Sequence, residues 1–170
     1  MRIATFALFL GLAYISAGVL GLVPAALYPA PADAPPTRYN ALYGYLLGLF
    51  PVNALHSIVH LAVGVWGVLA SRRVLSPKLF ARALAILYGV LALLGLIPGV
   101  NTLFGLLPLH GHDVWLHGAT ALLAGYFGWR TEHEVERRSN TSPDRRERTV
   151  PVPHERRFGH GDRRLPTSEV

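Results

Sequence analysis

Residues 48–70 read "GLFPVNALHSIVHLAVGVWGVLA" and contain no charged side chain. Residues 52–71 supply the run of about 20 apolar residues that a helix needs to cross a hydrocarbon core of about 30 Å. Lipid offers no hydrogen-bond partner to a free backbone group, so such a stretch must be helical. Asn53, just after Pro51, is a residue type that caps helices. The stretch therefore predicts a membrane-spanning helix over residues 52–71.

Three further charge-free stretches predict spans near residues 3–23, 79–97 and 112–130. Pro24 and Pro98 are expected to end the first and third spans, because proline cannot continue a helix, and Asp113 is expected to cap the fourth. The first apolar run exceeds the 7–15 residues or so of a signal-peptide core, so we expect it to be retained as a helix. The predicted fold class is an all-α, polytopic membrane protein with four transmembrane helices in residues 1–130.

The distribution of charge agrees with this interpretation. Residues 1–129 hold eight charged side chains, roughly 6%, whereas soluble domains average about 25%. That scarcity argues against a water-soluble globular enzyme. The chain has no cysteine, which excludes disulfides, thiolate metal sites and cysteine nucleophiles.

The basic residues also indicate orientation. Residues 71–82, "SRRVLSPKLFAR", carry four positive charges and no acid. Cytoplasmic loops are enriched in arginine and lysine, so this loop and both termini are expected in the cytoplasm of a cell whose plasma membrane the chain crosses. Because the basic residues lie between apolar spans, the sequence pI near 10.2 does not indicate a nucleic-acid partner.

Residues 131–170 differ in character from the rest. They are charged and contain prolines and few apolar side chains, so they cannot bury enough apolar surface to fold alone. We expect the fourth helix to continue to about Arg138 and the remainder to form a disordered cytoplasmic tail. The tail can contact anionic lipid or a cytoplasmic protein, but its interleaved acids favour a plain solvated segment.

The apolar region contains an internal similarity. Residues 14–24 align with 88–98, and residues 46–64 align with 103–121. The alignment predicts a four-helix bundle built from two parallel two-helix repeats, related by a pseudo-twofold axis along the membrane normal. The segments 43–53 and 103–111 are too short to cross and are expected to be interfacial or partly re-entrant on the outer face. The shared positions include Tyr14/Tyr88, Gly21/Gly95, Pro24/Pro98, Pro51/Pro108 and His60/His117.

Polar groups inside spans are the first functional candidates in a membrane protein. His56 and His60 on the second span, and Asp113 and His117 on the fourth, are each spaced four residues apart and share a helix face. The repeat places His56 opposite Asp113 and His60 opposite His117. We expect the second and fourth spans to pack in contact, with Gly64 and Ala121 leaving room and both imidazoles facing inward.

Several roles fit this set. The histidines can be structural, with hydrogen bonds to Tyr14, Tyr88 or Asn53 across helix contacts. They can instead ligate a divalent metal, or two facing histidines can ligate a haem iron. Proton or substrate handling is a further alternative. His110 and His112 lie near Asp113 and could extend a metal site at the outer surface, although a polar turn is the simpler interpretation.

Small residues follow one face of two spans and indicate close helix packing, within the bundle or in a homo-oligomer. They are Ala13, Ala17, Gly21, Ala85 and Gly89. The chain contains no P-loop, GxSxG, HExxH or dinucleotide-binding motif. The first interpretation is therefore a small non-enzymatic membrane protein with structural histidine pairs. The alternatives are a metal- or haem-binding, redox-associated membrane protein and a small transporter or channel subunit.

The pattern FPVNxxHxxxHLxxG, from Phe50 to Gly64, resembles the bacterial membrane family known as domain-of-unknown-function family 4383. The resemblance covers about residues 3–129 and implies a four-span membrane protein with no established activity. The architecture is also similar to DoxX-like four-helix membrane proteins, at the level of fold alone. The chain departs from the family at Ser57 and at His110, where asparagine is frequent, and this weakens the case for His110 as a ligand.

Overall fold

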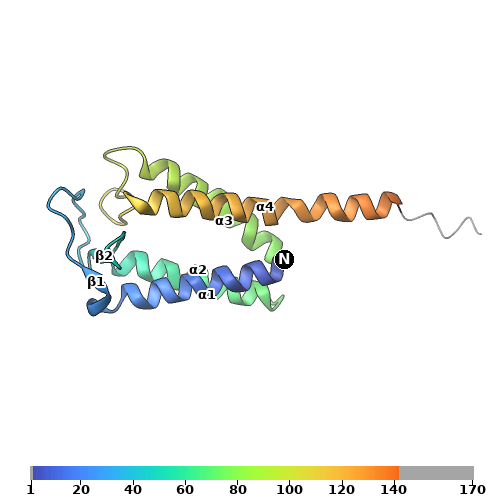
Figure 1. Ribbon diagram of the computed structural model, residues 1–170, viewed down its shortest axis with the longest axis horizontal. Coiled ribbons are helices and arrows are strands. Elements are labelled where there is room, and N and C mark those ends of the chain that lie inside the picture. The colour runs from blue at the N-terminus through green and yellow to red at the C-terminus, as the bar shows by residue number, and fades with distance from the viewer. Residues whose placement is uncertain (1, 142–170) are drawn as a thin grey trace, which may run out of the picture.

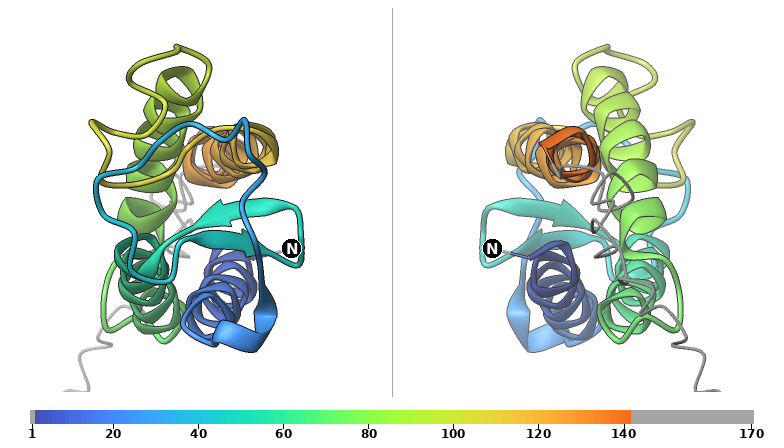
Figure 2. Two further views of the ribbon diagram at one scale, coloured as in Figure 1. Left: turned by 90° about the vertical axis from the view of Figure 1, so that its left-hand side faces the viewer. Right: turned by 90° about the vertical axis from the view of Figure 1, so that its right-hand side faces the viewer.

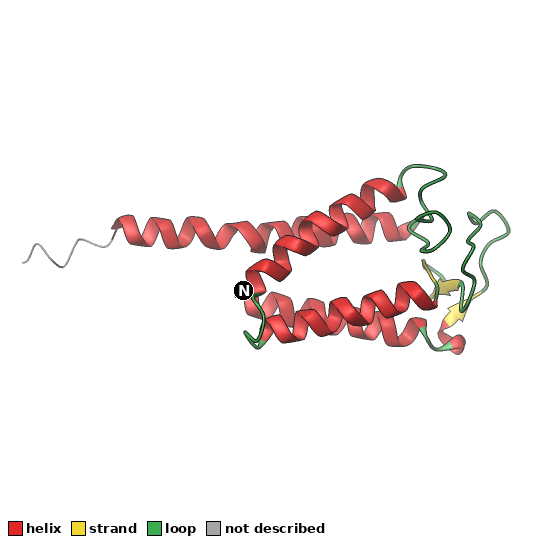
Figure 3. Ribbon diagram, turned by 180° about the vertical axis from the view of Figure 1, so that it is seen from behind, coloured by secondary structure: helices red, strands yellow, loops and turns green. Residues whose placement is uncertain are grey.

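The computed structural model describes residues 2–141, with side chains to residue 130, and most of this part of the chain is helical. Its long helices run side by side, and short strands and loops cover one end (Figures 1 and 3). The helices are α1 (Ile3–Gly21), α2 (Ala54–Ser71), α3 (Pro77–Gly95) and α4 (His112–Thr141). Their order and their bounds agree with the predicted spans to within a few residues, and α4 continues to Thr141, close to the expected continuation to about Arg138.

Local sequence explains where the helices begin and end. Asn53 caps α2 as predicted, because its Oδ1 accepts the backbone N–H of His56 at 2.9 Å. Pro24 and Pro98 lie just beyond the last turns of α1 and α3. The predicted capping role of Asp113 is wrong. Helix α4 already begins at His112, so Asp113 lies in the first turn and its side chain is buried in the interior.

The helices pack as two pairs, α1 along α2 and α3 along α4 (Figures 1 and 2). In the first pair the two backbones touch at glycines. A Cβ at Gly64 would lie 2.7 Å from the carbonyl oxygen of Gly11, and a Cβ at Gly11 would lie 2.8 Å from that of Gly64. Only glycine fits such a contact, so this row determines how closely α1 and α2 approach.

The expected close packing of α2 against α4 is wrong. These helices are not among the closely packed pairs of the described chain, and they meet only through long side chains at the centre. Gly64 faces α1, while Ala121 lies 3.8 Å from where a Cβ of Gly89 in α3 would be. These small residues therefore lie at the contacts within each helix pair, where the two backbones approach each other.

A small antiparallel sheet covers the end of the helices that lies away from the N-terminus (Figure 1). It consists of β1 (Leu27–Tyr28), β2 (Gly44–Leu46) and β3 (Phe50–Val52), and a 3₁₀ turn at Pro24–Ala26 precedes it. The all-α expectation missed this sheet. The hairpin between β2 and β3 turns at Leu47 and Gly48, which have positive φ angles of 55° and 73°. This turn was not predicted from the sequence, because it lies within a run of apolar residues.

Asn53 ties the two loops at this end to α2. Its Nδ2 donates to the carbonyl oxygens of Tyr39, at 3.0 Å, and Leu106, at 2.7 Å. The backbone N–H of Arg38 donates to the carbonyl of Gly105 at 2.8 Å. The loop that follows α1 and the loop that follows α3 are therefore joined to each other and to the start of α2.

The outer surface of the helices is apolar, as a bilayer environment requires. Helices α1, α2 and α3 are each long and apolar enough to cross a membrane, whereas the start of α4 carries His112, Asp113 and His117. Large apolar side chains point outward on every helix; they include Phe9, Leu12, Val65, Ile86 and Leu122. Residues 142–170, which make up most of the tail predicted to be disordered, lie outside the described residues.

Candidate functional site

Four polar side chains meet between α2 and α4. His56, His60, Asp113 and His117 are exposed by only 3%, 5%, 1% and 1%. One nitrogen from each of the three imidazoles lies within 4.8 Å of the others. The structure therefore brings together the set proposed from the sequence and turns it toward the interior.

Helix geometry places these groups at matched positions. His56 and His60 are one turn apart on α2, and their ring centroids are 4.4 Å apart. On α4, Asp113 and His117 are one turn apart, and the ring of His117 lies 6.2 Å from that of His56. The Asn53 cap fixes the start of α2 and hence the depth of both of its histidines.

The carboxylate of Asp113 faces one edge of two imidazoles. Its Oδ2 lies 3.5 Å from Nε2 of His117 and 4.0 Å from Nε2 of His56. Among the described residues, Nδ1 of each of the three histidines and Oδ2 of Asp113 have no hydrogen-bond partner. A buried polar atom without a partner costs about 1–3 kcal/mol. Four of them in one cluster therefore call for an explanation.

The predicted tyrosine partners contact the histidines mainly through their rings. The Tyr14 ring centroid lies 5.1 Å from that of His60, and the Tyr88 centroid lies 4.9 Å from that of His117. The hydroxyl of Tyr14 donates instead to Oγ1 of Thr120, at 3.3 Å. Sequence reasoning missed Thr120, because its repeat equivalent is a valine and no motif contains it.

Asn53 was also expected to pair with an imidazole, and this is wrong. Both of its amide donors and its oxygen bind backbone groups, so it has no capacity left for a histidine ring. Its side chain is fully buried between the outer loops and α2.

His110 and His112 do not extend the cluster. His112 is exposed, and neither residue belongs to the converging group found in the described chain. His110 lies in the loop before α4, where its ring centroid is 6.3 Å from that of Tyr45. Burial lowers the pKa of His110 below its ordinary value of 6.5, so this imidazole is neutral at pH 7.

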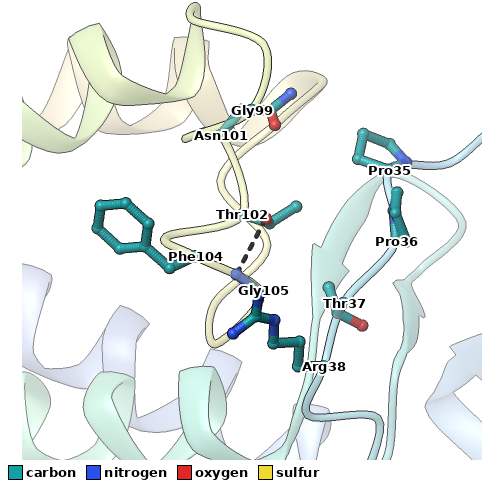
Figure 4. A pocket seen from close by; sticks show the side chains of 9 residues that line it. All are labelled: Pro35, Pro36, Thr37, Arg38, Gly99, Asn101, Thr102, Phe104 and Gly105. Atoms are coloured by element: carbon teal, nitrogen blue, oxygen red, sulfur yellow. Dashed lines mark hydrogen bonds between the residues drawn. The ribbon is translucent and has the colours of Figure 1, made fainter.

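Two cavities lie near these residues. The larger, about 550 Å³, is between the outer loops and is lined by Thr37, Arg38, Asn101 and Phe104 among others (Figure 4). Arg38 is the only charged residue in its lining, and no histidine or acid lines it. The smaller, about 110 Å³, is lined by Tyr14, His60 and Thr120 together with apolar side chains. Of these two cavities in the described part of the chain, the smaller one reaches the histidine cluster, at His60.

The donor set suits a transition-metal ion. Imidazole nitrogens bind Zn²⁺, Cu²⁺, Ni²⁺ and Fe²⁺. The nitrogens of a tetrahedral zinc site are about 3.3 Å apart at bond lengths of about 2.0–2.1 Å, so each nitrogen here would move by about 1 Å or less. Haem fits poorly, because pockets for drug-sized ligands are about 300–1,000 Å³ and the cavity beside His60 is about 110 Å³.

Comparison with known proteins places most of the chain in one family. A family model described as "Domain of unknown function (DUF4383)" matches residues 4–130, which covers the four predicted spans apart from residue 3. A search of curated proteins and a search of solved structures each found no match.

Proposed function

The chain belongs to the family described as domain of unknown function DUF4383, and from its geometry we propose a membrane protein that binds one transition-metal ion. The ligands in this proposal are the imidazoles of His56, His60 and His117, with one ring nitrogen from each. One observation carries it. One nitrogen of each buried ring lies within 4.8 Å of the others, and each ring has a nitrogen without a hydrogen-bond partner among the described residues. A single ion would bind the three converging nitrogens at once.

Asp113 has a supporting role in this proposal. Its Oδ2 lies 3.5 Å from Nε2 of His117 and 4.0 Å from Nε2 of His56, and it has no hydrogen-bond partner among the described residues. A small shift of either ring would let it accept from that nitrogen. A carboxylate that accepts from the second nitrogen of a metal-bound histidine fixes its tautomer and orientation. Asp113 itself lies outside the converging group of ligand atoms. The site then has three protein ligands and an open coordination position, which is typical of metal sites that bind a further ligand.

A purely structural role for the histidines is the second candidate. It requires hydrogen bonds across the helix contacts, and the partnerless Nδ1 atoms favour the metal instead. The two candidates differ in an observable way. Structural histidines stabilise the protein without any ion, whereas ligand histidines stabilise it only when the ion is added.

Metal content is the direct test. Protein purified in detergent should contain about one Zn²⁺ or Cu²⁺ per chain, or should take up one Zn²⁺ after treatment with a chelator. His60→Ala and His117→Ala should each weaken Zn²⁺ binding by at least tenfold. His112→Ala is the matched control, because His112 is an exposed histidine on the same helix as His117, and it should bind as the unchanged protein does. Absence of Zn²⁺ uptake by the unchanged protein would overturn the proposal.

We also propose four membrane spans with both termini in the cytoplasm of a cell whose plasma membrane holds the protein. Arg72, Arg73, Lys78 and Arg82 lie at the α2–α3 turn, and the N-terminus lies at the same end of the helices (Figure 1). The positive-inside bias supports a cytoplasmic position for that end. The pairing of α4 along α3, over its apolar part, supports α4 as the fourth span.

The proposed duplication is supported by equivalent contacts in the two helix pairs. Tyr14 packs on His60 in the first pair, and Tyr88 packs on His117 in the second. The ring centroids of the two tyrosines lie 5.3 Å apart, near the axis that would relate the pairs. Glycines show the same correspondence. Gly21 faces Ser57, and Gly95 faces Val114, which is the repeat equivalent of Ser57.

A further inference from the structure

The smaller cavity lies on the line where α1 passes α4. Its α1 wall is made by Leu10, Ala13 and Ala17, and its α4 wall by Leu116 and Thr120. Helix α1 packs closely along α2, and α4 along α3, so the line between α1 and α4 is the looser one. The small side chains of Ala13 and Ala17 widen it further.

The cavity runs from the apolar exterior toward the histidine cluster. Ala13 and Leu116 are exposed on the outside of the helices, where lipid would lie. At the inner end are His60, Tyr14 and Thr120, which are all buried. The cavity therefore leads sideways from the bilayer to one of the proposed metal ligands.

The approach to the cluster from the outer end is covered. At the outer end, five residues are almost completely buried: Pro51 and Val52 of β3, the helix cap Asn53, and Pro108 and Leu109 of the loop before α4. They form a packed layer above His56 and Asp113. Among the cavities found in the described chain, the one between the outer loops is lined by none of the cluster residues.

The polarity of the cavity specifies its ligand. The wall near the lipid is aliphatic, and the polar atoms are gathered at the inner end, where the Tyr14 hydroxyl donates to Thr120 at 3.3 Å. Such a cavity accepts a small polar head that enters first and an unbranched apolar tail that trails toward lipid. A charged molecule would lose its hydration there at a high free-energy cost.

We propose that this cavity is a lateral binding site through which an uncharged, lipid-dissolved amphiphile with a small thiol or hydroxyl head reaches the metal from the bilayer. The inference rests on the proposed metal site and adds the ligand class and the route of access. The open coordination position of a three-histidine site accepts the head, and the tail lies between Ala13, Ala17 and Leu116.

Co²⁺ substitution makes the proposal measurable. The chelator-treated protein, in phosphatidylcholine nanodiscs, is loaded with Co²⁺, whose visible absorption reports on its ligands. 1-Butanethiol dissolves in the bilayer and should add a sulfur-to-cobalt charge-transfer band, with release of the thiol proton to the buffer. 2-Mercaptoethanesulfonate has a similar thiol but a fixed negative charge. It should give no such band at the same concentration.

Variants of the cavity wall provide the sharper comparison. Ala13→Leu and Ala17→Leu should each weaken 1-butanethiol binding by at least tenfold and leave the initial Co²⁺ spectrum unchanged. That unchanged spectrum shows that the site is still folded. Ser16→Leu is the matched control, because Ser16 is an exposed small residue of α1 that does not line the cavity, and it should bind 1-butanethiol normally.

The outcomes separate this inference from the proposed function. If Co²⁺ binds but 1-butanethiol adds no band, the lateral site is wrong and the metal site stands. The lateral site is also wrong if the charged thiol binds equally well, or if both cavity variants bind like the unchanged protein. If Co²⁺ produces no histidine-dependent spectrum, the proposed function fails, and this inference fails with it.

Discussion

Asn53 shows how much one polar side chain can do in an apolar chain. It caps α2 and donates to the backbone carbonyls of two loops from a fully buried position. The sequence predicted the cap, because asparagine before an apolar run is a local signal. It could not predict the two loop contacts, because Tyr39 and Leu106 are distant along the chain and only the fold brings them together.

We expect Asn53→Ala to destabilise the protein by about 2–4 kcal/mol, from a lost cap of about 1 kcal/mol and two lost, part-buried hydrogen bonds at about 0.5–1.5 kcal/mol each. Unfolding by sodium dodecyl sulfate in mixed micelles measures the change. Asn53→Asp keeps the capping oxygen and loses the amide donors, so its loss should be smaller. Asn40→Ala, at an exposed asparagine of the loop that contains Tyr39, should have little effect. Equal losses for Asn53→Ala and Asn40→Ala would contradict the assignment.

His110 makes the stability of the outer end depend on pH. Burial lowers its pKa below 6.5, so below that pH the unfolded chain binds more protons at this residue than the folded one. Stability is therefore complete above about pH 6.5 and decreases as the pH falls. We expect the melting temperature of His110→Asn to fall less than that of the unchanged protein between pH 7 and pH 5. A parallel fall of both proteins would show that His110 is not responsible.

At the scale of elements, helices were predictable because length and freedom from charge identify them in lipid. The sheet was not, since its strands are two or three residues long and lie in an apolar run. The sequence also identified the four candidate site residues through spacing and repetition. The prediction that Gly64 packs against α4 was wrong, because Gly64 faces α1. A small residue indicates that another helix comes close but not which helix it is.

Glycines of the helices should respond to substitution in opposite directions. Gly64→Ala should destabilise the protein by about 1–3 kcal/mol, because its Cβ would lie 2.7 Å from the Gly11 carbonyl oxygen. Gly118→Ala on α4 meets no atom within 4 Å and should be neutral or stabilising by up to about 1 kcal/mol. Thermal unfolding of the two variants tests the pairing of α1 with α2. A Gly64→Ala variant as stable as Gly118→Ala would contradict it.

At the scale of the whole molecule, orientation rests on the charged turn between α2 and α3. We expect reporter fusions after residues 35, 76, 105 and 140 to lie outside, inside, outside and inside the cytoplasm. Alkaline phosphatase and green fluorescent protein, which are active on opposite sides of a bacterial inner membrane, provide the readout. An outside position for the fusion at 140 alone would mean that α4 does not cross, and the four-span proposal would be wrong.

The two helix pairs contribute different side chains to the candidate site, His56 and His60 from the first and His117 from the second, with Asp113 beside it. During synthesis the ribosome completes α1 and α2 before α3 exists. The first hairpin therefore enters the membrane with only part of the ligand set, and no ion of the proposed kind can be held firmly until the second hairpin has docked. Metal uptake would then mark the end of assembly, and chains interrupted in the turn at residues 72–76 would leave biogenesis without it.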